Sequence, residues 1–582
     1  MKKIDYNDIE EIRSYIERYG YNEYNCNIVT LLMWKDVYEL YYEIHEHFFV
    51  GYWLYHDRVR WMMPLCDEAY FKEAVDFMLE YSKQYGVDFV VEAAVEPFVE
   101  LLKRYYPKNT FIWRLEENAG DYVYDVSMHA TLKGKKMQKR RNHYNAFMKE
   151  YEGRFEFLSY QNTMKEEVLS FLNQWKDTHD RKDDIEAEIN GIEGLLAHYD
   201  ELNLLGGCLY IDGKLEAFTL ASKLYEDTLQ IHVEKANRSI RGLYVAVLKY
   251  FLNEHLEYHF INREDDLGLP ELRKAKMDLH PLYRLVKYAI GLNQTKLIRP
   301  DNQYTSQIKQ LWLDSFADED ENSTEFYFNT LYDPKNTYAI ECYGQILAAM
   351  QIKPMTLKIG DKEIQTHFIV GVCTKRNFRG NGFMRTMMEK ALEDHKEDRL
   401  LILQAYNWDV YRSFGFNEAY YHKIANIKEP FANVDEFVYN FKEEVRAEAL
   451  LEAYQHFTVH YNGYRIRDKA YYENYFIPYH QNENHYFLTL YHSEKCIGYL
   501  VYEKSDDVIL IHESIIDDQE GLKVALNYLL HETKRIEIRM ADNIELTDNE
   551  KTLANMAIRY QDSMLQAEIE KSESTLFISE TL

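Results

Sequence analysis

The residues best suited to chemistry lie between His367 and Asp394, in the stretch HFIVGVCTKRNFRGNGFMRTMMEKALED. An apolar run predicts a strand, the small residues around Arg379-Gly380-Asn381-Gly382 predict a turn, and the apolar spacing after the turn predicts a helix. Backbone N–H groups in such a turn, together with the positive end of the helix, attract an anion. Glycine is needed because a side chain would block the approach of a phosphate. The stretch therefore predicts a pyrophosphate site.

Two common phosphate-binding motifs do not fit this turn. A nucleoside-triphosphate P-loop needs a lysine directly after its last glycine, and Phe383 follows Gly382 instead. A dinucleotide-binding fingerprint needs a third glycine three residues after the second, and Arg385 occupies that position. The remaining pattern is Arg-Gly-x-Gly-x-Met between a strand and a helix.

The segment VGVCTKRNFRGNGFMRTMMEKAL resembles the coenzyme A pyrophosphate motif of the GNAT superfamily of acyl-CoA N-acyltransferases. Met384 replaces the final small residue of that motif, as is common in the Eis-like (enhanced intracellular survival) tandem acyltransferases that it resembles most. The resemblance implies acetyl transfer from acetyl-CoA to a primary amine, on a small molecule or a peptide, without a metal. It implies that the coenzyme is held by Arg379, Gly380, Asn381, Gly382, Phe383 and Met384, and by the backbone of Val372 and Thr374.

A second match lies downstream in LLILQAYNWDVYRSFGFNEAY, which reads as a strand, a short helix and Tyr-x-x-Phe-Gly-Phe. The resemblance implies that Tyr411 lies near the coenzyme A sulfur and protonates the departing thiolate. A phenol with a pKa of about 10 can do so as the thiolate forms. The chain has 51 tyrosines among 582 residues, so an ordinary core tyrosine is the competing interpretation. His367 is a candidate proton relay from the amine, and its alternative is a core histidine.

The C-terminal quarter, residues 431–582, resembles the second, degenerate acyltransferase-like domain of the tandem family. It carries LLEAYQHFTVHYNGYRIRDKAYYENYF and FLTLYHSEKCIGYLVYEKSDDVILIHESI but no Arg-Gly-x-Gly turn. We therefore expect no coenzyme A in this quarter. Members of the family continue into a sterol-carrier-like domain whose terminal carboxylate acts as the base. We expect no such domain here, which leaves the general base unassigned.

The N-terminal half carries a different resemblance. Its segments NEYNCNIVTLLMW, GKKMQKRRNHYNAF and NREDDLGLPELRKAK are similar to the lysylphosphatidylglycerol synthetase C-terminal domain family, with Arg273, Lys274 and Lys276 at basic positions of that family. The family has two acyltransferase-type folds in tandem, and its best-known members transfer an aminoacyl group from transfer RNA to a lipid. Transfer RNA is therefore an alternative partner. We rank it behind a small-molecule or acyl-CoA function, because the net charge of -29 opposes a polyanion and no membrane-spanning segment is expected.

Basic residues gather in one segment of this half. Lys133, Lys135, Lys136, Lys139, Arg140 and Arg141 occur within HATLKGKKMQKRRNHYNAFMKEY. Met137, Tyr144, Met148 and Tyr151 recur at helical spacing, which predicts a helix with opposed basic and apolar faces. The segment is either a phosphate-binding patch, for coenzyme A or nucleic acid, or a solvated helix face.

Two other groups of polar residues in this half are weaker candidates. Glu264, Asp265 and Asp266 could hold an amine or a metal, but a surface turn is the favoured interpretation in a chain with 97 acidic residues. His255 and His259 share a helical face, but the sequence HLEYH lacks the glutamate of a metalloprotease motif. We therefore predict no metal site.

The elements that must position these residues are mixed strands and helices. Short strands such as VDFVVEAA, GGCLYIDG and LEYHFIN alternate with helical spacing, and long Gly/Ser linkers are absent. This pattern indicates an α+β class, with several GNAT-type folds in tandem built from mixed sheets flanked by helices. We expect four domains with the bounds 1–124, 125–292, 296–430 and 431–582, and each could be a diverged copy of one fold.

Bulk composition limits the location of the protein. The six cysteines are scattered, without a Cys-x-x-Cys pair, which is typical of reduced thiols. The N-terminus carries acids in its first turns rather than the apolar core of a signal peptide. We therefore expect a cytoplasmic protein.

Overall fold

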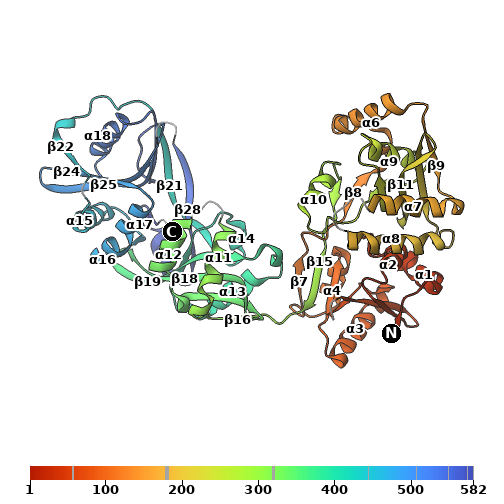
Figure 1. Ribbon diagram of the computed structural model, residues 1–582. Helices are drawn as coiled ribbons and strands as arrows, with labels where there is room; N and C mark the ends of the chain where they lie inside the picture. Colours follow the sequence, from red (N-terminus) through yellow and green to blue (C-terminus); the bar gives the residue numbers. More distant parts are fainter. Residues whose placement is uncertain are drawn as a thin grey trace. The chain divides into compact units, whose positions relative to one another are not determined.

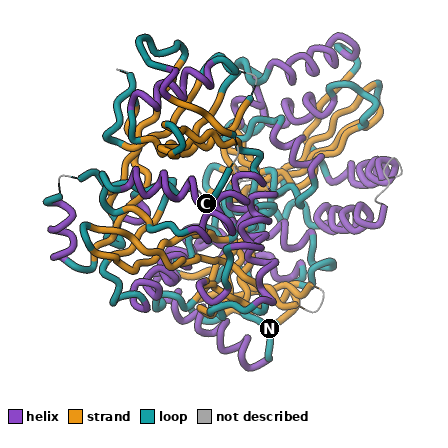
Figure 2. The backbone as a smooth tube through the Cα atoms, turned by 90° about the vertical axis from the view of Figure 1, so that its left-hand side faces the viewer, coloured by secondary structure: helices purple, strands orange, loops and turns teal. Residues whose placement is uncertain are grey.

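The computed structural model describes the chain except residues 56–57, 177–181, 317–320, 444, 506, 548–549, 573 and 581–582. The chain divides into two compact units, residues 1–293 and 294–582. Within each unit, helices cover mixed sheets (Figure 1, Figure 2), which confirms the predicted α+β class. The division falls after Asn293, and the further domain bounds near 124 and 430 stay predictions.

The N-terminal unit contains two sheets. The first has the strand order β1 (Lys2–Lys3), β2 (Leu40–Ile44), β3 (Phe48–Tyr55), β4 (Arg58–Trp61), β6 (Val90–Ala94), β15 (Tyr288–Leu292) and β7 (Phe111–Leu115), with β5 (Leu65–Cys66) on β3. The second has the order β9 (Phe155–Ser159), β10 (Leu205–Ile211), β11 (Lys214–Tyr225), β12 (Thr228–Ala236), β13 (Phe260–Asn262), β8 (Tyr122–Asp125) and β14 (Tyr283–Arg284).

The C-terminal unit contains one continuous sheet. Its order is β16 (Lys296–Ile298), β17 (Thr337–Cys342), β18 (Gln345–Ile359), β19 (Lys362–Thr374), β20 (Leu400–Leu403), β28 (Lys551–Tyr560), β21 (Asn417–Ile427), β27 (Ile536–Ala541), β26 (Ile509–Ile516), β25 (Lys495–Lys504), β24 (Tyr486–His492) and β22 (Tyr439–Lys442). The short strand β23 (Tyr464–Arg465) pairs with β18.

The same seven-strand order occurs four times. We call these the first to fourth folds, and they are built around the neighbouring strands β4 and β6, β12 and β13, β19 and β20, and β26 and β27. In each fold these two strands pair in parallel, whereas every other neighbouring pair is antiparallel. The described residues thus contain four copies of one strand order, which the sequence analysis had left open.

A strand is exchanged between the folds of each unit. In the N-terminal unit β15 inserts between β6 and β7, far from both in sequence. In the C-terminal unit β28 inserts between β20 and β21. The boundary expected near residue 124 falls inside β8, which belongs to the sheet of the second fold. Each fold is therefore completed by a strand that its neighbour in the sequence supplies.

The helices have the following bounds. In the N-terminal unit they are α1 (Ile9–Tyr19), α2 (Ile28–Met33), α3 (Phe71–Tyr85), α4 (Glu96–Tyr105), α5 (Val126–Thr131), α6 (Gln138–Tyr151), α7 (Lys165–Lys176), α8 (Lys182–Ala197), α9 (Leu243–Asn253) and α10 (Pro270–Met277). In the C-terminal unit they are α11 (Thr305–Ser315), α12 (Glu321–Thr330), α13 (Phe383–Asp394), α14 (Asp409–Arg412), α15 (Ala447–Thr458), α16 (Lys469–Tyr471), α17 (Ile477–Asn482), α18 (Gln519–Leu530) and α19 (Ser563–Glu570). Within the described residues, no helix is both long enough and apolar enough to cross a bilayer.

Candidate functional site

The predicted anion-binding turn lies between β19 and α13. After a short 3-10 helix at Arg376–Phe378, Gly380 and Gly382 take left-handed backbone angles, with φ of 87° and 80°. Such angles strain any residue with a side chain, which is the physical reason for glycine here. A Cβ atom on Gly382 would meet no atom within 4 Å. The N-terminus of α13 is therefore open to a ligand.

The start of α13 is suited to a negatively charged group. The first N–H groups of a helix have no acceptor within the helix, and the helix dipole is positive at this end. Arg379 and Arg385 are exposed on either side of Gly382. Phe383 is buried and Met384 half-buried, so Phe383 anchors the helix in the core and offers a ligand only its backbone.

Strand β19 bulges just before the turn. Val370 pairs with Gln351, but Cys373 pairs with Ala349, so β19 has one residue more than β18 over this interval. The extra residue comes at Gly371, whose φ is 61°. A Cβ atom on Gly371 would lie 2.1 Å from the ring of Trp312. A side chain at this position would therefore displace a buried tryptophan from α11.

Beyond the bulge, β19 and β20 separate. Their parallel pairing ends at Ile369 and Leu403, while the other edge of β19 stays paired with β18 up to Thr374. Val372 and Thr374 lie in the stretch of β19 that has lost its partner on the β20 side. An unpaired strand edge of this kind can bind an extended, amide-rich chain as an added strand.

Tyr411 lies in α14, which follows the separated end of β20. Burial raises the pKa of its phenol to about 12, and the neighbouring thiol of Cys373 contributes in the same direction. The influence of Cys373 places Tyr411 beside the end of β19 that leads into the turn. Phe414 and Phe416 are buried, and Gly415 between them has a φ of 84°. These residues hold the short helix against the sheet.

The structure does not bring His367 to the same place. Its Nδ1 atom lies 2.6 Å from Oδ2 of Asp398, and its ring centroid is 4.0 Å from that of His395. His395 caps the C-terminal end of α13, whereas the turn lies at the other end of that 12-residue helix, about 18 Å away at 1.5 Å per residue. The role of His367 as a proton relay stays a prediction. Over this distance, other groups would have to carry the proton between His367 and the turn.

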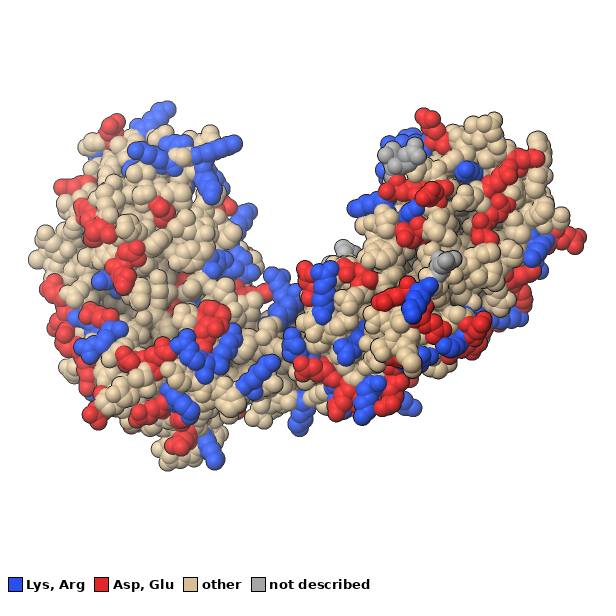
Figure 3. Space-filling view, turned by 180° about the vertical axis from the view of Figure 1, so that it is seen from behind, with Lys and Arg blue, Asp and Glu red and all other residues tan. Residues whose placement is uncertain are grey.

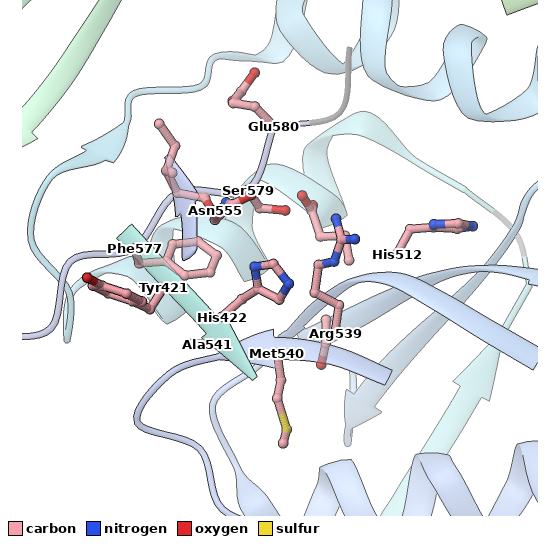
Figure 4. A pocket seen from close by; sticks show the side chains of 13 residues that line it. Tyr421, His422, His512, Arg539, Met540, Ala541, Asn555, Phe577, Ser579 and Glu580 are labelled. Atoms are coloured by element: carbon pink, nitrogen blue, oxygen red, sulfur yellow. Dashed lines mark hydrogen bonds between the residues drawn. The ribbon is translucent and has the colours of Figure 1, made fainter. Parts of the chain in front are cut away.

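The corresponding helix N-termini of the second and fourth folds are closed. In the second fold, a Cβ atom on Gly242 at the start of α9 would lie 2.2 Å from the carbonyl oxygen of His143 in α6. In the fourth fold, the carboxylate of Asp518 accepts from the backbone N–H of Glu520 at the start of α18. The cleft between β26 and β27 is reduced to a cavity of about 20 Å³, lined in part by the chain's own Phe577–Glu580 (Figure 4). Within the described residues, the turn before α13 is thus more open than these two.

Asp265 and Asp266 are buried and Glu264 is half-buried, so the predicted surface turn was wrong. Asp265 and Asp266 are 9% and 0% exposed. The hydroxyl of Tyr24 donates to Asp265 at 3.0 Å, and that of Tyr122 donates to Asp266 at 2.5 Å. The Arg273 guanidinium holds two oxygens of Asp266 at 2.8 and 3.0 Å. Burial alone would raise the pKa of Asp266, but these bonds lower it to about 2.

A buried lysine that no motif indicated lies close to these acids. The Nζ atom of Lys287 is 2.5 Å from Asp121 and 2.9 Å from Glu23, and all three side chains are nearly inaccessible. Burial alone would lower the pKa of Lys287, but Asp121 and Glu23 outweigh it and raise that pKa. Their positions, 23, 121 and 287, are far apart in sequence, so only the fold brings them together.

The basic segment forms the wall of a large pocket. Lys133, Lys135 and Lys136 are exposed before α6, and Figure 3 shows Lys and Arg side chains gathered on this part of the N-terminal unit. The adjacent pocket has a volume of about 760 Å³. Its charged lining residues are Lys139, Arg140, His143, Glu234, Arg238, Arg241, Arg263, Lys276 and Asp278. Three of the six basic residues thus lie before the helix rather than on a face of it, and of the six only Lys139 and Arg140 line the pocket.

Some of these charges are already paired. Lys139 lies 3.0 Å from Asp278, and Arg263 lies 3.1 Å from Glu234. Arg140 is different, because burial lowers its pKa to about 10 and its Nε atom has no hydrogen-bond partner.

His255 and His259 are each near one carboxylate. Neither belongs to a group of metal-binding side chains among the residues described.

Comparison with protein families matches both halves of the chain to acyltransferase domains. Residues 297–419 match the family model described as "Acetyltransferase (GNAT) domain", and residues 16–291 match "Phosphatidylglycerol lysyltransferase, C-terminal". The C-terminal half thus carries a GNAT acyltransferase domain, and the N-terminal half is of the lysylphosphatidylglycerol synthetase C-terminal type. Both resemblances expected from the sequence are confirmed.

Individual relatives are more distant. The uncharacterized protein MYCGA3080 of Mycoplasmoides gallisepticum is 23% identical over 181 residues, which are 30% of this chain and 57% of that protein. The chain thus spans little more than half the length of this curated relative.

Among solved structures, a conserved protein of unknown function from Bacteroides thetaiotaomicron is 28% identical, with a TM-score of 0.46, and covers 50% of this chain and 98% of its own. L-PGS from Bacillus licheniformis is 13% identical, with a TM-score of 0.37 and coverages of 50% and 93%. Eis1 from Mycobacterium abscessus is 12% identical, with a TM-score of 0.38 and coverages of 46% and 74%.

Proposed function

We propose that the third fold transfers an acetyl group from acetyl-CoA to a primary amine of a small molecule or peptide, in the cytoplasm. The observation that carries this proposal is the meeting of three features at one end of β19. These are the open helix N-terminus at Gly382, the unpaired strand edge at Val372 and Thr374, and the phenol of Tyr411. Together they offer a site for a pyrophosphate, a pantetheine arm and a leaving thiolate.

The reaction follows from these positions. The turn and the cations beside it bind the pyrophosphate, and the free edge of β19 aligns the pantetheine amides. The Val372 N–H polarises the thioester carbonyl while the neutral amine attacks it. The C–N bond forms, the C–S bond breaks, and Tyr411 gives its proton to the sulfur. The attacking nitrogen becomes positively charged as the C–N bond forms and must lose one proton. We assign that proton to water or to a relay that includes His367, and the Tyr411 phenolate regains a proton from solvent.

The raised pKa of Tyr411 has two consequences. The phenol is protonated throughout the physiological range, so it is always ready to act as an acid. A phenol at about 12 is, however, a weak donor toward a free thiolate, whose conjugate thiol has a pKa near ~8.5. Burial in the same cleft also disfavours the charged thiolate and so raises the pKa of the thiol. The pKa values of the phenol and the thiol are therefore closer together when the proton is transferred.

The direct test is binding and turnover with the full chain. We expect acetyl-CoA to bind at one site per chain in calorimetry, and free thiol to appear only when a primary amine is also present. A panel of polyamines, aminoglycosides and peptide amines with a colorimetric thiol reagent would identify the acceptor class. Binding without thiol release across the panel would contradict the enzymatic proposal and leave a coenzyme A-binding protein.

The pocket beside α6 supports a second candidate, an aminoacyl-tRNA-dependent transfer in the N-terminal unit. The pocket has a volume of about 760 Å³ and a cationic wall, so it could receive the aminoacylated end of a transfer RNA. Each phosphate contact makes affinity fall more steeply with salt, by about 0.7 to 0.9 in the logarithmic slope. If the second candidate is right, reversing the exposed charges in Lys135→Glu/Lys136→Glu should reduce that slope by nearly 2.

Filter binding of aminoacylated transfer RNA across a salt series measures this slope. Lys83→Glu, on the exposed surface of α3 in the same unit, is the matched charge control. No measurable RNA binding at low salt would exclude the second candidate and leave the pocket to a small molecule.

A further inference from the structure

Three side chains with metal-binding atoms meet at one edge of the fourth fold. They are His485, which directly precedes β24, Glu503 in β25 and His512 in β26. Oε2 of Glu503 lies 3.8 Å from Nε2 of His485 and 3.5 Å from Nε2 of His512. The two imidazole rings are stacked, with centroids 4.5 Å apart and planes 24° from parallel. The group is separate from the third fold, where the proposed acetyl transfer takes place.

The strand register explains how these residues meet. Tyr486 pairs with Tyr502, so the preceding His485 lies across from Glu503. In the next pair of strands, Val501 faces Glu513 but Tyr502 faces Ile511, which makes His512 the extra residue of a β-bulge. A bulge re-aims the side chain of its extra residue. Here it turns His512 toward the other two.

The separations are close to those around a tetrahedral zinc ion. With zinc–ligand distances of about 2.0 to 2.1 Å, neighbouring ligand atoms lie roughly 3.3 to 3.5 Å apart. The observed 3.5 and 3.8 Å need shifts of only a few tenths of an ångström. Two imidazoles with one glutamate, completed by a water, is a known zinc donor set.

Two unpartnered nitrogen atoms strengthen this interpretation. Nε2 of His512 is buried and has no hydrogen-bond partner. On the other side of the group, Nδ1 of His485 lies 2.9 Å from Nδ1 of His480. His480 is only 1% exposed, and its own Nε2 atom has no partner. The ring of a metal-binding histidine is usually fixed by a hydrogen bond from its other nitrogen, most often to a carboxylate, a backbone carbonyl or water. Here the nitrogen of His480 takes that position.

A second group of the same composition is less suitable. In the third fold, Asp398 already holds Nδ1 of His367 at 2.6 Å. Two atoms that close cannot both bind one zinc ion until they separate by roughly 0.7 Å, since tetrahedral neighbours lie about 3.3 Å apart. That group is satisfied by its own hydrogen bond, whereas the group of the fourth fold is not.

We propose that His485, Glu503 and His512 form a zinc site that ties together β24, β25 and β26. A divalent ion bound by two neutral imidazoles and one carboxylate would give the site a net charge of +1. The positive charge of Arg539 acts on His512 and opposes the ion, while Glu503 lies within reach of both histidines and favours it. Figure 4 shows His512 and Arg539 among the residues that line the small cavity of this fold.

The test uses the untagged chain of residues 1–582 after treatment with a chelator and desalting. We expect calorimetry with ZnCl2 to show one site per chain, and thermal unfolding to shift upward with added zinc. Mg2+ should produce neither effect, because it prefers oxygen ligands. His485→Ala/His512→Ala should remove the site, and His480→Phe should weaken it by roughly 10- to 100-fold, the scale for an outer-shell partner.

Two controls make the result decisive. His492→Ala removes an exposed histidine of β24 in the same fold and should leave zinc binding unchanged. Acetyl-CoA binding, which belongs to the third fold, reports whether each variant is folded. Zinc binding that survives in folded His485→Ala/His512→Ala, or that is lost in His395→Ala instead, would overturn the proposal.

Discussion

Gly382→Glu should abolish measurable acetyl-CoA binding while the protein stays folded. The substitution puts a side chain and a negative charge at the open N-terminus of α13, where the pyrophosphate is proposed to bind. Hydrogen bonds to a charged group contribute about 1.5–3 kcal/mol each, so the loss of two corresponds to at least a ~100-fold weaker Kd. Calorimetry with acetyl-CoA measures the change.

The matched control is Gly344→Glu. Gly344 has the same φ of 80° and the same empty surroundings as Gly382, but it lies in the turn between β17 and β18. Gly344→Glu therefore reproduces the backbone strain and the added charge at a place remote from the turn before α13. Equal loss of binding in both variants would point to unfolding, and unchanged affinity in folded Gly382→Glu would remove the site from this turn.

Tyr411→Phe should lower kcat by about 100-fold or more, the scale of a lost general acid, and leave the affinity for acetyl-CoA near the wild-type value. The ring and its packing are kept, and only the hydroxyl is removed. Because the pKa of Tyr411 is about 12, its ionisation should cause no loss of wild-type activity between pH 7 and 10.

Steady-state and single-turnover kinetics separate the chemical step from binding. Tyr343→Phe, at an exposed tyrosine of the same fold, controls for the loss of a hydroxyl and should have no effect. Turnover of Tyr411→Phe within a factor of about two of wild type would make Tyr411 a packing residue.

Local features of the third fold could be predicted from the sequence. The strand, the glycine turn and the start of α13 follow one another within a few residues, and their geometry depends on φ angles and apolar spacing that neighbouring residues determine. The role of Phe383 was only partly foreseen, since its side chain is in the core.

The features that the sequence missed depend on contacts between distant residues. Glu264–Asp266 was assigned to the surface because its partners Tyr24 and Tyr122 lie more than a hundred positions away. Nothing near Gly371 shows that Trp312 packs on it, and nothing near residue 551 shows that β28 completes the sheet of the third fold.

The amino-acid sequence by itself determined the α+β class, two acyltransferase resemblances and the position of one glycine turn between a strand and a helix, because each depends on a contiguous run of residues. Only the tertiary structure decided which helix N-termini are open, where the buried charges of the N-terminal unit pair, and that His485, Glu503 and His512 meet. Those outcomes depend on strand register and on a bulge at His512. A shift of one residue would turn such side chains to the opposite face of the sheet.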